Sequence, residues 1–276
     1  MPIITLTTDF GTKDYFVGAL KGAIYTELEE ANIVDISHQI SPFNITETAY
    51  ILKNAYQNFP KGTIHIIGVD SEISVENKPI AILLDSQYFI CCDNGIISMI
   101  TKEIIPEKIV EVTIQNENEN KSNPLGVFIK VACHIARGGM LEVIGKKIEK
   151  VKELFEIQPQ INSDQNQIVG SIIYIDNFGN VVSNISEKIF QNIGKGRDFE
   201  ITARNYKFTQ IYKKYNDIVD YTVAEEKRQN DGKKLAIFNA ANYLEISIYR
   251  SNLNTVGGAS SLLGLQYRDN ITIRFK

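Results

Sequence analysis

Two aspartates follow apolar segments that are typical of buried strands. Asp9 comes shortly after the β-branched run 3–6, and the run 63–69 ends at Asp70. In open α/β sheets ligands bind outside the carboxyl ends of the strands, where a carboxylate can accept hydrogen bonds from a ribose diol. The sequence therefore predicts a small-molecule site that begins at Asp9. The alternative is that Asp9 only braces the turn that follows it.

Three nearby side chains admit a structural or a functional role. Asp14 precedes a helix predicted over 15–28 and could be its N-cap. Phe43, directly after Pro42, could offer its ring to an adenine or a thioether, or could pack into the core as a staple beside the next helix. His38 lies in the same loop, where a structural histidine is the expected reading.

The composition is that of an ordinary globular protein. The chain has 276 residues, which is long enough for two domains with their own cores. It is 43% hydrophobic and 22% charged, as is ordinary for a globular protein. A net charge of -4, without basic clusters interleaved with aromatics, argues against a nucleic-acid partner. No apolar run approaches the roughly 20 residues that span a bilayer. With no basic leader after Met1, we expect a cytoplasmic protein without a membrane partner.

Cysteine and histidine are too few and too scattered for a metal centre. The three cysteines are an odd number in apolar surroundings, which predicts buried, reduced thiols. The three histidines and the cysteines form neither a C-x-x-C nor an H-E-x-x-H pattern. We therefore expect no metal site.

The pattern of elements changes along the chain. Strands and helices alternate up to about residue 157, which predicts an α/β domain over 1–157. The amide-rich stretch 158–167 is predicted as a linker. Short alternating segments follow, so 168–276 is expected to be a mostly antiparallel β domain. The segments on which this depends are strands at 33–36, 79–84, 88–92, 107–115, 168–175, 181–185, 198–203, 234–238, 243–249 and 270–275, and helices at 15–28, 45–58 and 127–137.

Five segments, in order and at similar spacing, resemble the motifs of the S-adenosyl-L-methionine (SAM) hydroxide adenosyltransferases, the family that also contains the fluorinase and chlorinase. They are 7–12 (Thr-Thr-Asp-Phe-Gly-Thr), 35–43 (Asp-Ile-Ser-His-Gln-Ile-Ser-Pro-Phe), 93–95 (Asp-Asn-Gly), 176–184 (Asp-Asn-Phe-Gly-Asn-Val-Val-Ser-Asn) and 239–246 (Asn-Ala-Ala-Asn-Tyr-Leu-Glu-Ile). The resemblance covers the whole length of the chain.

The resemblance implies a fold, an assembly and a reaction. The fold is a Rossmann-like N-terminal domain followed by a β-rich C-terminal domain. The assembly is a homotrimer with sites between the N-terminal domain of one subunit and the C-terminal domain of the next. The reaction is cleavage of SAM at C5′ by hydroxide to give adenosine and methionine, with SAM as substrate and no further cofactor.

The family pattern also implies contacts for individual residues, and the group types suit them. The ligand contacts are Asp9 for the ribose hydroxyls, Phe43 for packing on the ligand, Asp14 and Asp176 for the methionine ammonium, Phe178 and Asn180 for adenine, and Asn239 from the last motif.

The catalytic positions depart from the family pattern. The hydrolases that this chain resembles carry an Asp, an Arg seven residues later, and a His. Asp70 matches the first, whereas Asn77, beside Lys78, replaces the arginine and Asn123 replaces the histidine. Loss of a histidine base removes a contribution of roughly 10²–10⁴-fold. We predict that Asp70, Asn77, Lys78 and Asn123 position the water in another way.

The sequence leaves several functions open. The first is a slow SAM hydrolase, and the second is a non-catalytic SAM or adenosine binding protein that has lost turnover. An enzyme for another adenosyl or nucleoside substrate and a trimeric scaffold with an empty pocket are weaker alternatives. A halogenase fits less well, because its serine is Pro124 here and its Ser-Arg pair for the substrate carboxylate is Ala240-Ala241.

Overall fold

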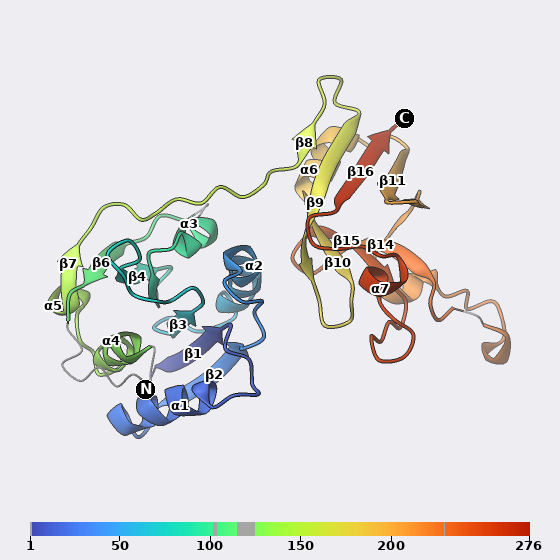
Figure 1. Ribbon diagram of the computed structural model, residues 1–276. Coiled ribbons are helices and arrows are strands. Elements are labelled where there is room, and N and C mark those ends of the chain that lie inside the picture. The colour runs from blue at the N-terminus through green and yellow to red at the C-terminus, as the bar shows by residue number, and fades with distance from the viewer. Residues whose placement is uncertain (1, 102–103, 115–124, 229) are drawn as a thin grey trace. The chain divides into compact units, whose positions relative to one another are not determined.

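The computed structural model describes residues 2–101, 104–114, 125–228 and 230–276 (Figure 1). The chain divides into two compact units, Met1–Glu156 and Ile157–Lys276, each with its own sheet and core. The stretch 158–167, predicted as a linker, includes the short strand β8 (Gln160–Ile161). This strand pairs with β9 (Gln167–Ile175), so part of the second unit lies within the amide-rich stretch.

The first unit is built on a seven-stranded sheet in the order β2-β1-β3-β5-β4-β6-β7. The pairs from β2 to β5 are parallel and those from β5 to β7 are antiparallel. This confirms the predicted α/β class. The strands are β1 (Ile3–Thr8), β2 (Asn32–Ser37), β3 (Ile64–Gly68), β4 (Pro79–Leu84), β5 (Gln87–Cys92), β6 (Lys108–Val112) and β7 (Gly145–Lys147).

Helices cover both faces of this sheet (Figure 1). Consecutive side chains of β3 point to opposite faces, so Ile66 belongs to one apolar core and Ile67 to another. Leu20 and Phe128 complete the first core, and Leu52 belongs to the second. The helices are α1 (Phe16–Glu27) and α4 (Gly126–Ala136) on the first core, α2 (Ile45–Tyr56) and α3 (Ile96–Ile100) on the second, and α5 (Leu141–Ile144) beside β6 and β7.

The helix starts differ from one another in how they are capped. The side chain of Asn44 accepts a hydrogen bond from the Glu47 amide at 3.1 Å and caps α2. The N-cap of α1 is Tyr15, which has helical backbone angles and makes no side-chain cap bond. The prediction that Asp14 could cap α1 is therefore wrong, because Asp14 precedes the cap residue and is exposed.

The second unit is a mostly antiparallel sheet that nearly closes into a barrel. In the described residues it runs β12-β11-β16-β9-β10-β15-β14-β13, and the β13–β14 pair alone is parallel. The apolar side chains of these strands form one core, as predicted for a β-rich domain. The remaining strands are β10 (Val181–Ser186), β11 (Phe199–Ala203), β12 (Tyr206–Phe208), β13 (Ile211–Tyr212), β14 (Lys234–Phe238), β15 (Tyr243–Ile248) and β16 (Asn270–Phe275).

Several short elements of the second unit have no counterpart among the predicted segments. A strand of two or three residues is too short to show a period of its own, which explains why β12 and β13 were missed. The helix α6 (Glu187–Gly194) does have a start signal, since Ser186 Oγ accepts from the Ile189 amide at 3.2 Å. The other short helices are η1 (Tyr215–Ile218), η2 (Glu225–Lys227) and α7 (Ala259–Leu262).

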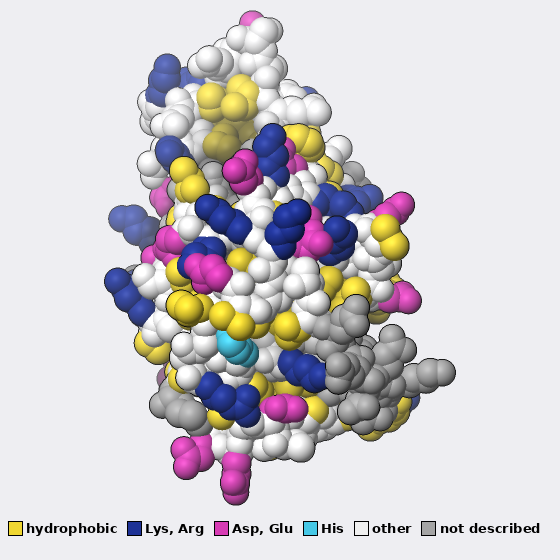
Figure 2. Space-filling view, turned by 90° about the vertical axis from the view of Figure 1, so that its left-hand side faces the viewer, with side chains coloured by type: hydrophobic (Ala, Val, Ile, Leu, Met, Phe, Trp, Pro, Cys, Tyr) yellow, Lys and Arg dark blue, Asp and Glu magenta, His cyan; other side chains and the backbone are white. Residues whose placement is uncertain are grey.

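The cysteines are buried and free, which confirms the prediction of reduced thiols. Burial, reinforced by the charges of Asp70 and Asp93, raises the pKa of Cys92 to about 12, so its thiol stays protonated. Within the described residues no cluster of His, Cys, Asp and Glu suits a metal ion, and no helix is long and apolar enough to cross a membrane. On the face drawn in Figure 2, acidic and basic side chains are interspersed.

Candidate functional site

The carboxyl ends of β1 and β3 lie side by side, because these parallel neighbours pair with Thr8 in register with Gly68. Asp9 follows β1 directly, and Asp70 follows β3 after one residue. A Cβ atom at Gly68 would lie 2.6 Å from Leu125 Cδ1 and 3.2 Å from Thr8 Cγ2, so glycine leaves room at this strand end for the Leu125 side chain. The structure thus brings both predicted strand-end aspartates to one edge of the sheet.

Asp9 connects this edge to the loop that follows β2. Its Oδ2 atom accepts a hydrogen bond from the Phe43 amide at 2.9 Å, and Oδ1 has no hydrogen bond with any described residue. Phe43 has a φ of +60°, an unusual value for a bulky residue. Its ring is 73% exposed in the single chain, so the alternative that Phe43 packs into the core is wrong. This edge of the sheet therefore offers a ligand the Oδ1 atom of Asp9 and the exposed ring of Phe43.

Asp70 is held by its backbone. Its φ of +46° is strained for a residue with a side chain, and two side-chain amides hold its carbonyl oxygen. Asn77 Nδ2 donates to that oxygen at 3.0 Å and Asn94 Nδ2 at 3.1 Å. The Asp70 carboxylate itself accepts no hydrogen bond from the part of the chain that the structure describes.

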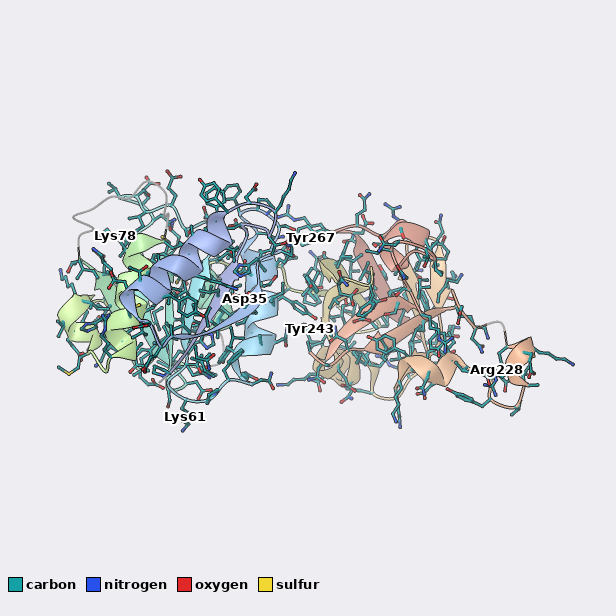
Figure 3. All side chains as sticks on the ribbon, turned by 90° about the horizontal axis from the view of Figure 1, so that it is seen from below. Asp35, Lys61, Lys78, Arg228, Tyr243 and Tyr267 are labelled. Carbon is teal, nitrogen blue, oxygen red and sulfur yellow. The ribbon has the colours of Figure 1, made fainter. Side chains whose placement is uncertain are left out.

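Neither Asn77 nor Lys78 makes a hydrogen bond with the Asp70 carboxylate. The amide nitrogen of Asn77 is occupied by backbone carbonyls, and its Oδ1 is buried without a partner among the described residues. The ammonium of Lys78 (Figure 3) lies 2.9 Å from Glu111 Oε1. Asn123 lies outside the described residues. Their predicted roles in positioning water stay predictions.

In the second unit, a tight turn joins β9 to β10 and presents Phe178. Asp176 Oδ1 accepts hydrogen bonds from the amides of Phe178 at 2.9 Å and Asn180 at 2.8 Å, and its Oδ2 accepts from Asn180 Nδ2 at 2.9 Å. Asn180 is buried, whereas the Phe178 ring is 58% exposed. Three predicted ligand-binding residues therefore form one turn, in which Asp176 fastens the backbone and Phe178 projects.

Gly179→Ala should destabilise this turn. Gly179 has a φ of +77°, and an added Cβ would lie 2.6 Å from Leu253 Cδ2. We expect the free energy of unfolding, measured by urea denaturation, to fall by about 2 kcal/mol. Gly196→Ala is the matched control, because its φ is +79° but its Cβ would enter open space; it should cost only about 1 kcal/mol. Equal losses would show that the close packing of this turn contributes nothing.

A buried carboxylate lies beneath the loop that carries Asn239. Glu245 is 3% exposed, and its oxygens accept hydrogen bonds from the Tyr215 hydroxyl at 2.8 Å, the Ser247 hydroxyl at 2.5 Å and Asn239 Nδ2 at 3.2 Å. Burial raises the pKa of Glu245, the three hydrogen bonds reduce this effect, and the charge of Asp176 reinforces it. The predicted residues Asn239 and Asp176 thus share one electrostatic environment.

A cavity of about 580 Å³ opens beside this network. Its lining includes Tyr215, Asn239 and Ala240, together with the basic side chains of Lys213 and Lys214. Within the second unit, the loop after β14 therefore borders a space large enough for a small ligand.

The two units match the two domain models of one family. Residues 4–145 match the SAM hydroxide adenosyltransferase N-terminal domain, and residues 170–272 match the SAM hydroxide adenosyltransferase C-terminal domain. The chain belongs to this family. The resemblance drawn from the five sequence motifs is confirmed, and the domain matches fall on the two structural units.

Known proteins are similar over most or all of the chain. An (R)-S-adenosyl-L-methionine hydrolase of Methanocaldococcus jannaschii is 29% identical, with 99% of this chain and 96% of that protein covered. A fluorinase of Actinopolyspora mzabensis is 22% identical, over 71% of this chain and 75% of its own. The crystal structure of an uncharacterized conserved protein from Thermotoga maritima superposes with a TM-score of 0.80 at 26% identity, covering 99% of this chain and 100% of that one.

Sequence reasoning missed the buried polar groups of this SAM hydroxide adenosyltransferase chain. Glu245 stands between Leu244 and Ile246 in an apolar strand, and that isolated charge was the available signal. His38 was expected to be structural. The structure places it, 5% exposed, in direct contact with the end of β1.

Proposed function

We propose that this protein hydrolyses SAM at C5′ and releases adenosine and L-methionine. The observation that carries the proposal is the pair of aspartates, Asp9 and Asp70, at the joined carboxyl ends of β1 and β3. The match of the whole chain to a protein named as a SAM hydrolase supports the same reaction.

The reaction needs a positioned water molecule and a site that excludes other water. The water oxygen forms a bond to C5′ while the bond from C5′ to sulfur breaks. The electron pair of that bond goes to sulfur, so the sulfonium leaves as the neutral thioether of methionine. The attacking oxygen loses its proton to the Asp70 carboxylate, which passes it to solvent. Alignment and desolvation supply the acceleration.

The binding roles follow from the group types. The free Asp9 Oδ1 accepts hydrogen bonds from the ribose hydroxyls, and the exposed ring of Phe43 packs against the ligand. The remaining contacts are Asp14 and Asp176 to the methionine ammonium, Phe178 and Asn180 to adenine, and Asn239 at the edge of the cavity. We propose that a homotrimer completes each site from two subunits, which light scattering on the pure protein would test.

The water-positioning group is weaker than a histidine base. Asn77 contributes by holding the backbone of Asp70. Lys78 can help to position the water only if its ion pair with Glu111 breaks. Asn123 adds an amide that can orient water without taking its proton. The expected consequence is turnover slower than with a histidine base in place, by at most roughly 10²–10⁴-fold because the Asp70 carboxylate still takes the proton.

A second candidate is an adenosyl-binding protein without turnover. It is favoured by a specific observation: the amide nitrogen of Asn77 is occupied by backbone carbonyls and the Lys78 ammonium by Glu111. Such a protein would keep Asp9, Phe43 and the turn at Asp176 for binding alone.

One experiment separates the two candidates. Pure protein is incubated with SAM, adenosine and methionine are followed by chromatography, and SAM binding is measured by calorimetric titration. Protein-free SAM under the same conditions gives the spontaneous rate. Formation of adenosine and methionine in equal amounts, faster than the spontaneous rate, supports the hydrolase. Binding without adenosine supports the binding protein, and no binding of SAM or adenosine would exclude both.

A further inference from the structure

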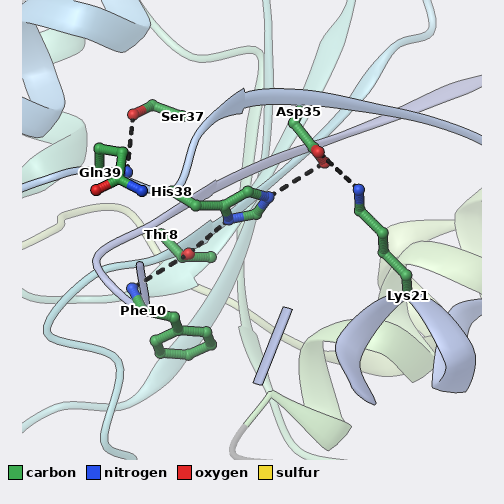
Figure 4. A network of polar contacts seen from close by, with 7 residues as sticks. All are labelled: Thr8, Phe10, Lys21, Asp35, Ser37, His38 and Gln39. Carbon is green, nitrogen blue, oxygen red and sulfur yellow. Dashed lines mark hydrogen bonds and ion pairs between the residues drawn. The ribbon is translucent and has the colours of Figure 1, made fainter. Parts of the chain in front are cut away.

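His38 lies between a surface ion pair and the end of β1 (Figure 4). Its Nδ1 atom is 2.7 Å from Thr8 Oγ1, and its Nε2 atom is 3.1 Å from Asp35 Oδ1. Lys21 Nζ approaches the other oxygen of Asp35 at 2.6 Å. His38 and Thr8 are buried, whereas Lys21 and Asp35 are partly exposed. A polar chain therefore runs from α1 through β2 to the residue before Asp9.

The donors and acceptors around His38 favour one tautomer of its ring. The carboxylate of Asp35 can only accept, which favours the tautomer that carries its hydrogen on Nε2. His38 Nδ1 then accepts from the Thr8 hydroxyl. The Thr8 oxygen keeps lone pairs and accepts from the Phe10 amide at 3.4 Å. Asp35 Oδ1 lies within ion-pair distance of Nε2, but the geometry is not that of a hydrogen bond, and Nε2 has no hydrogen-bond partner in the described residues.

The same residue also holds the turn through its backbone. The carbonyl oxygen of His38 accepts a hydrogen bond from the Gly11 amide at 2.7 Å. His38 thus contacts the turn on both sides of Asp9, at Thr8 by its ring and at Gly11 by its carbonyl. The next residue, Gln39, adds a hydrogen bond from Nε2 to Thr12 Oγ1 at 3.1 Å. These contacts hold the backbone on both sides of Asp9, whose carboxylate accepts its own hydrogen bond from the Phe43 amide.

We propose that His38 is a positioning residue, which fixes the turn from Thr8 to Gly11 and so aims the Asp9 carboxylate at the ligand. Touching neither the ligand nor the water, it acts through Thr8. The identity of the ligand rests on the proposed function, whereas the effect on the turn does not.

Two amide variants separate the two ring nitrogens. Asn in His38→Asn has its amide near the place of Nδ1 and can keep the contact with Thr8. Gln in His38→Gln reaches farther, toward Asp35, and loses the contact with Thr8. Thr8→Val removes the hydroxyl and keeps the shape, so it should reproduce the effect of His38→Gln. The control is His134→Asn, since the one hydrogen bond of the His134 ring in the described residues is to the backbone carbonyl of Met140, far from the Asp9 turn in sequence.

Two readouts are measured on each folded variant, with melting temperature as the check of folding. We expect amide hydrogen exchange at Phe10 and Gly11 to speed up about 10-fold in His38→Gln and Thr8→Val, and to stay near the wild-type rate in His38→Asn and His134→Asn. The Kd for SAM should rise about 10-fold in the same two variants. In variants that turn over, KM should change more than kcat.

The outcomes separate this proposal from the proposed function. Wild-type exchange rates at Phe10 and Gly11 in both His38→Gln and Thr8→Val would overturn the role of His38. Equal weakening of SAM binding by His38→Asn and His38→Gln would also overturn it, because the loss would then be general. If wild-type protein binds no SAM, the proposed function fails, and the exchange rates alone decide whether His38 fixes the turn.

Discussion

Asp9→Asn should weaken the binding of SAM by roughly 10- to 100-fold. Hydrogen bonds to a charged acceptor contribute about 1.5–3 kcal/mol, and about 1.4 kcal/mol is a factor of ten in affinity. The variant keeps the loop in place, because the asparagine oxygen can still accept from the Phe43 amide. What it loses is the second acceptor, Oδ1, and the negative charge. Calorimetric titration with SAM and with adenosine measures the effect.

The matched control is Asp70→Asn, the same change at the neighbouring strand end. The proposed roles predict that it leaves the affinity for SAM nearly unchanged and lowers the rate of adenosine release. Asp164→Asn, in an exposed turn of the second unit, should change neither quantity. Equal losses of affinity for Asp9→Asn and Asp70→Asn would show that the two carboxylates have been assigned wrongly.

Acid should destabilise the first unit through His65, which is fully buried in the sheet. His65 Nδ1 is 2.7 Å from Thr5 Oγ1, its Nε2 is 2.8 Å from Gln87 Oε1, and its ring stacks on Phe89. Burial lowers the pKa of His65 from 6.5 to about 4, and the hydrogen bond with Gln87 opposes this effect. The folded protein therefore keeps His65 neutral where an unfolded chain takes up a proton.

The sign of the pH dependence follows from this difference. Above pH 6.5 both states are neutral at His65 and stability is complete, whereas below it the unfolded state binds the proton first. The free energy of unfolding should fall by about 3 kcal/mol between pH 6.5 and pH 4 from this residue alone. Urea denaturation over that range measures the loss.

A variant without the imidazole isolates this contribution from the carboxylates that also titrate in acid. His65→Gln should be less stable at pH 7 but should lose about 3 kcal/mol less than the wild type between pH 6.5 and pH 4. An unchanged slope in His65→Gln would contradict the account.

Local signals were sufficient where a segment had both a period and clear ends. The predicted strands 79–84 and 234–238 match β4 and β14 residue for residue, because turn residues bound them. Asp9 and Asp70 were each predicted at the end of a strand from the apolar run before them. That the two ends share one edge follows from the parallel pairing of β1 with β3.

Long-range pairing set the features that the sequence did not predict. Lys78 comes next to β4 and Glu111 lies on β6, and these strands become neighbours only through the sheet order. The local contacts of Asp176 were also not predicted: both its oxygens accept hydrogen bonds from its own turn, and its expected contact with an ammonium stays a prediction. Which hydrogen bonds and ion pairs a side chain forms depends on the folded geometry, which its residue type alone does not reveal.

The most direct test of the central claim is hydrolysis of SAM in water enriched in oxygen-18. Attack of water on C5′ places the water oxygen in the new 5′-hydroxyl group. Mass spectrometry should therefore find oxygen-18 in adenosine and none in methionine, in proportion to the enrichment of the water. Unlabelled adenosine, or 5′-methylthioadenosine with labelled homoserine, would contradict the proposed hydrolysis at C5′.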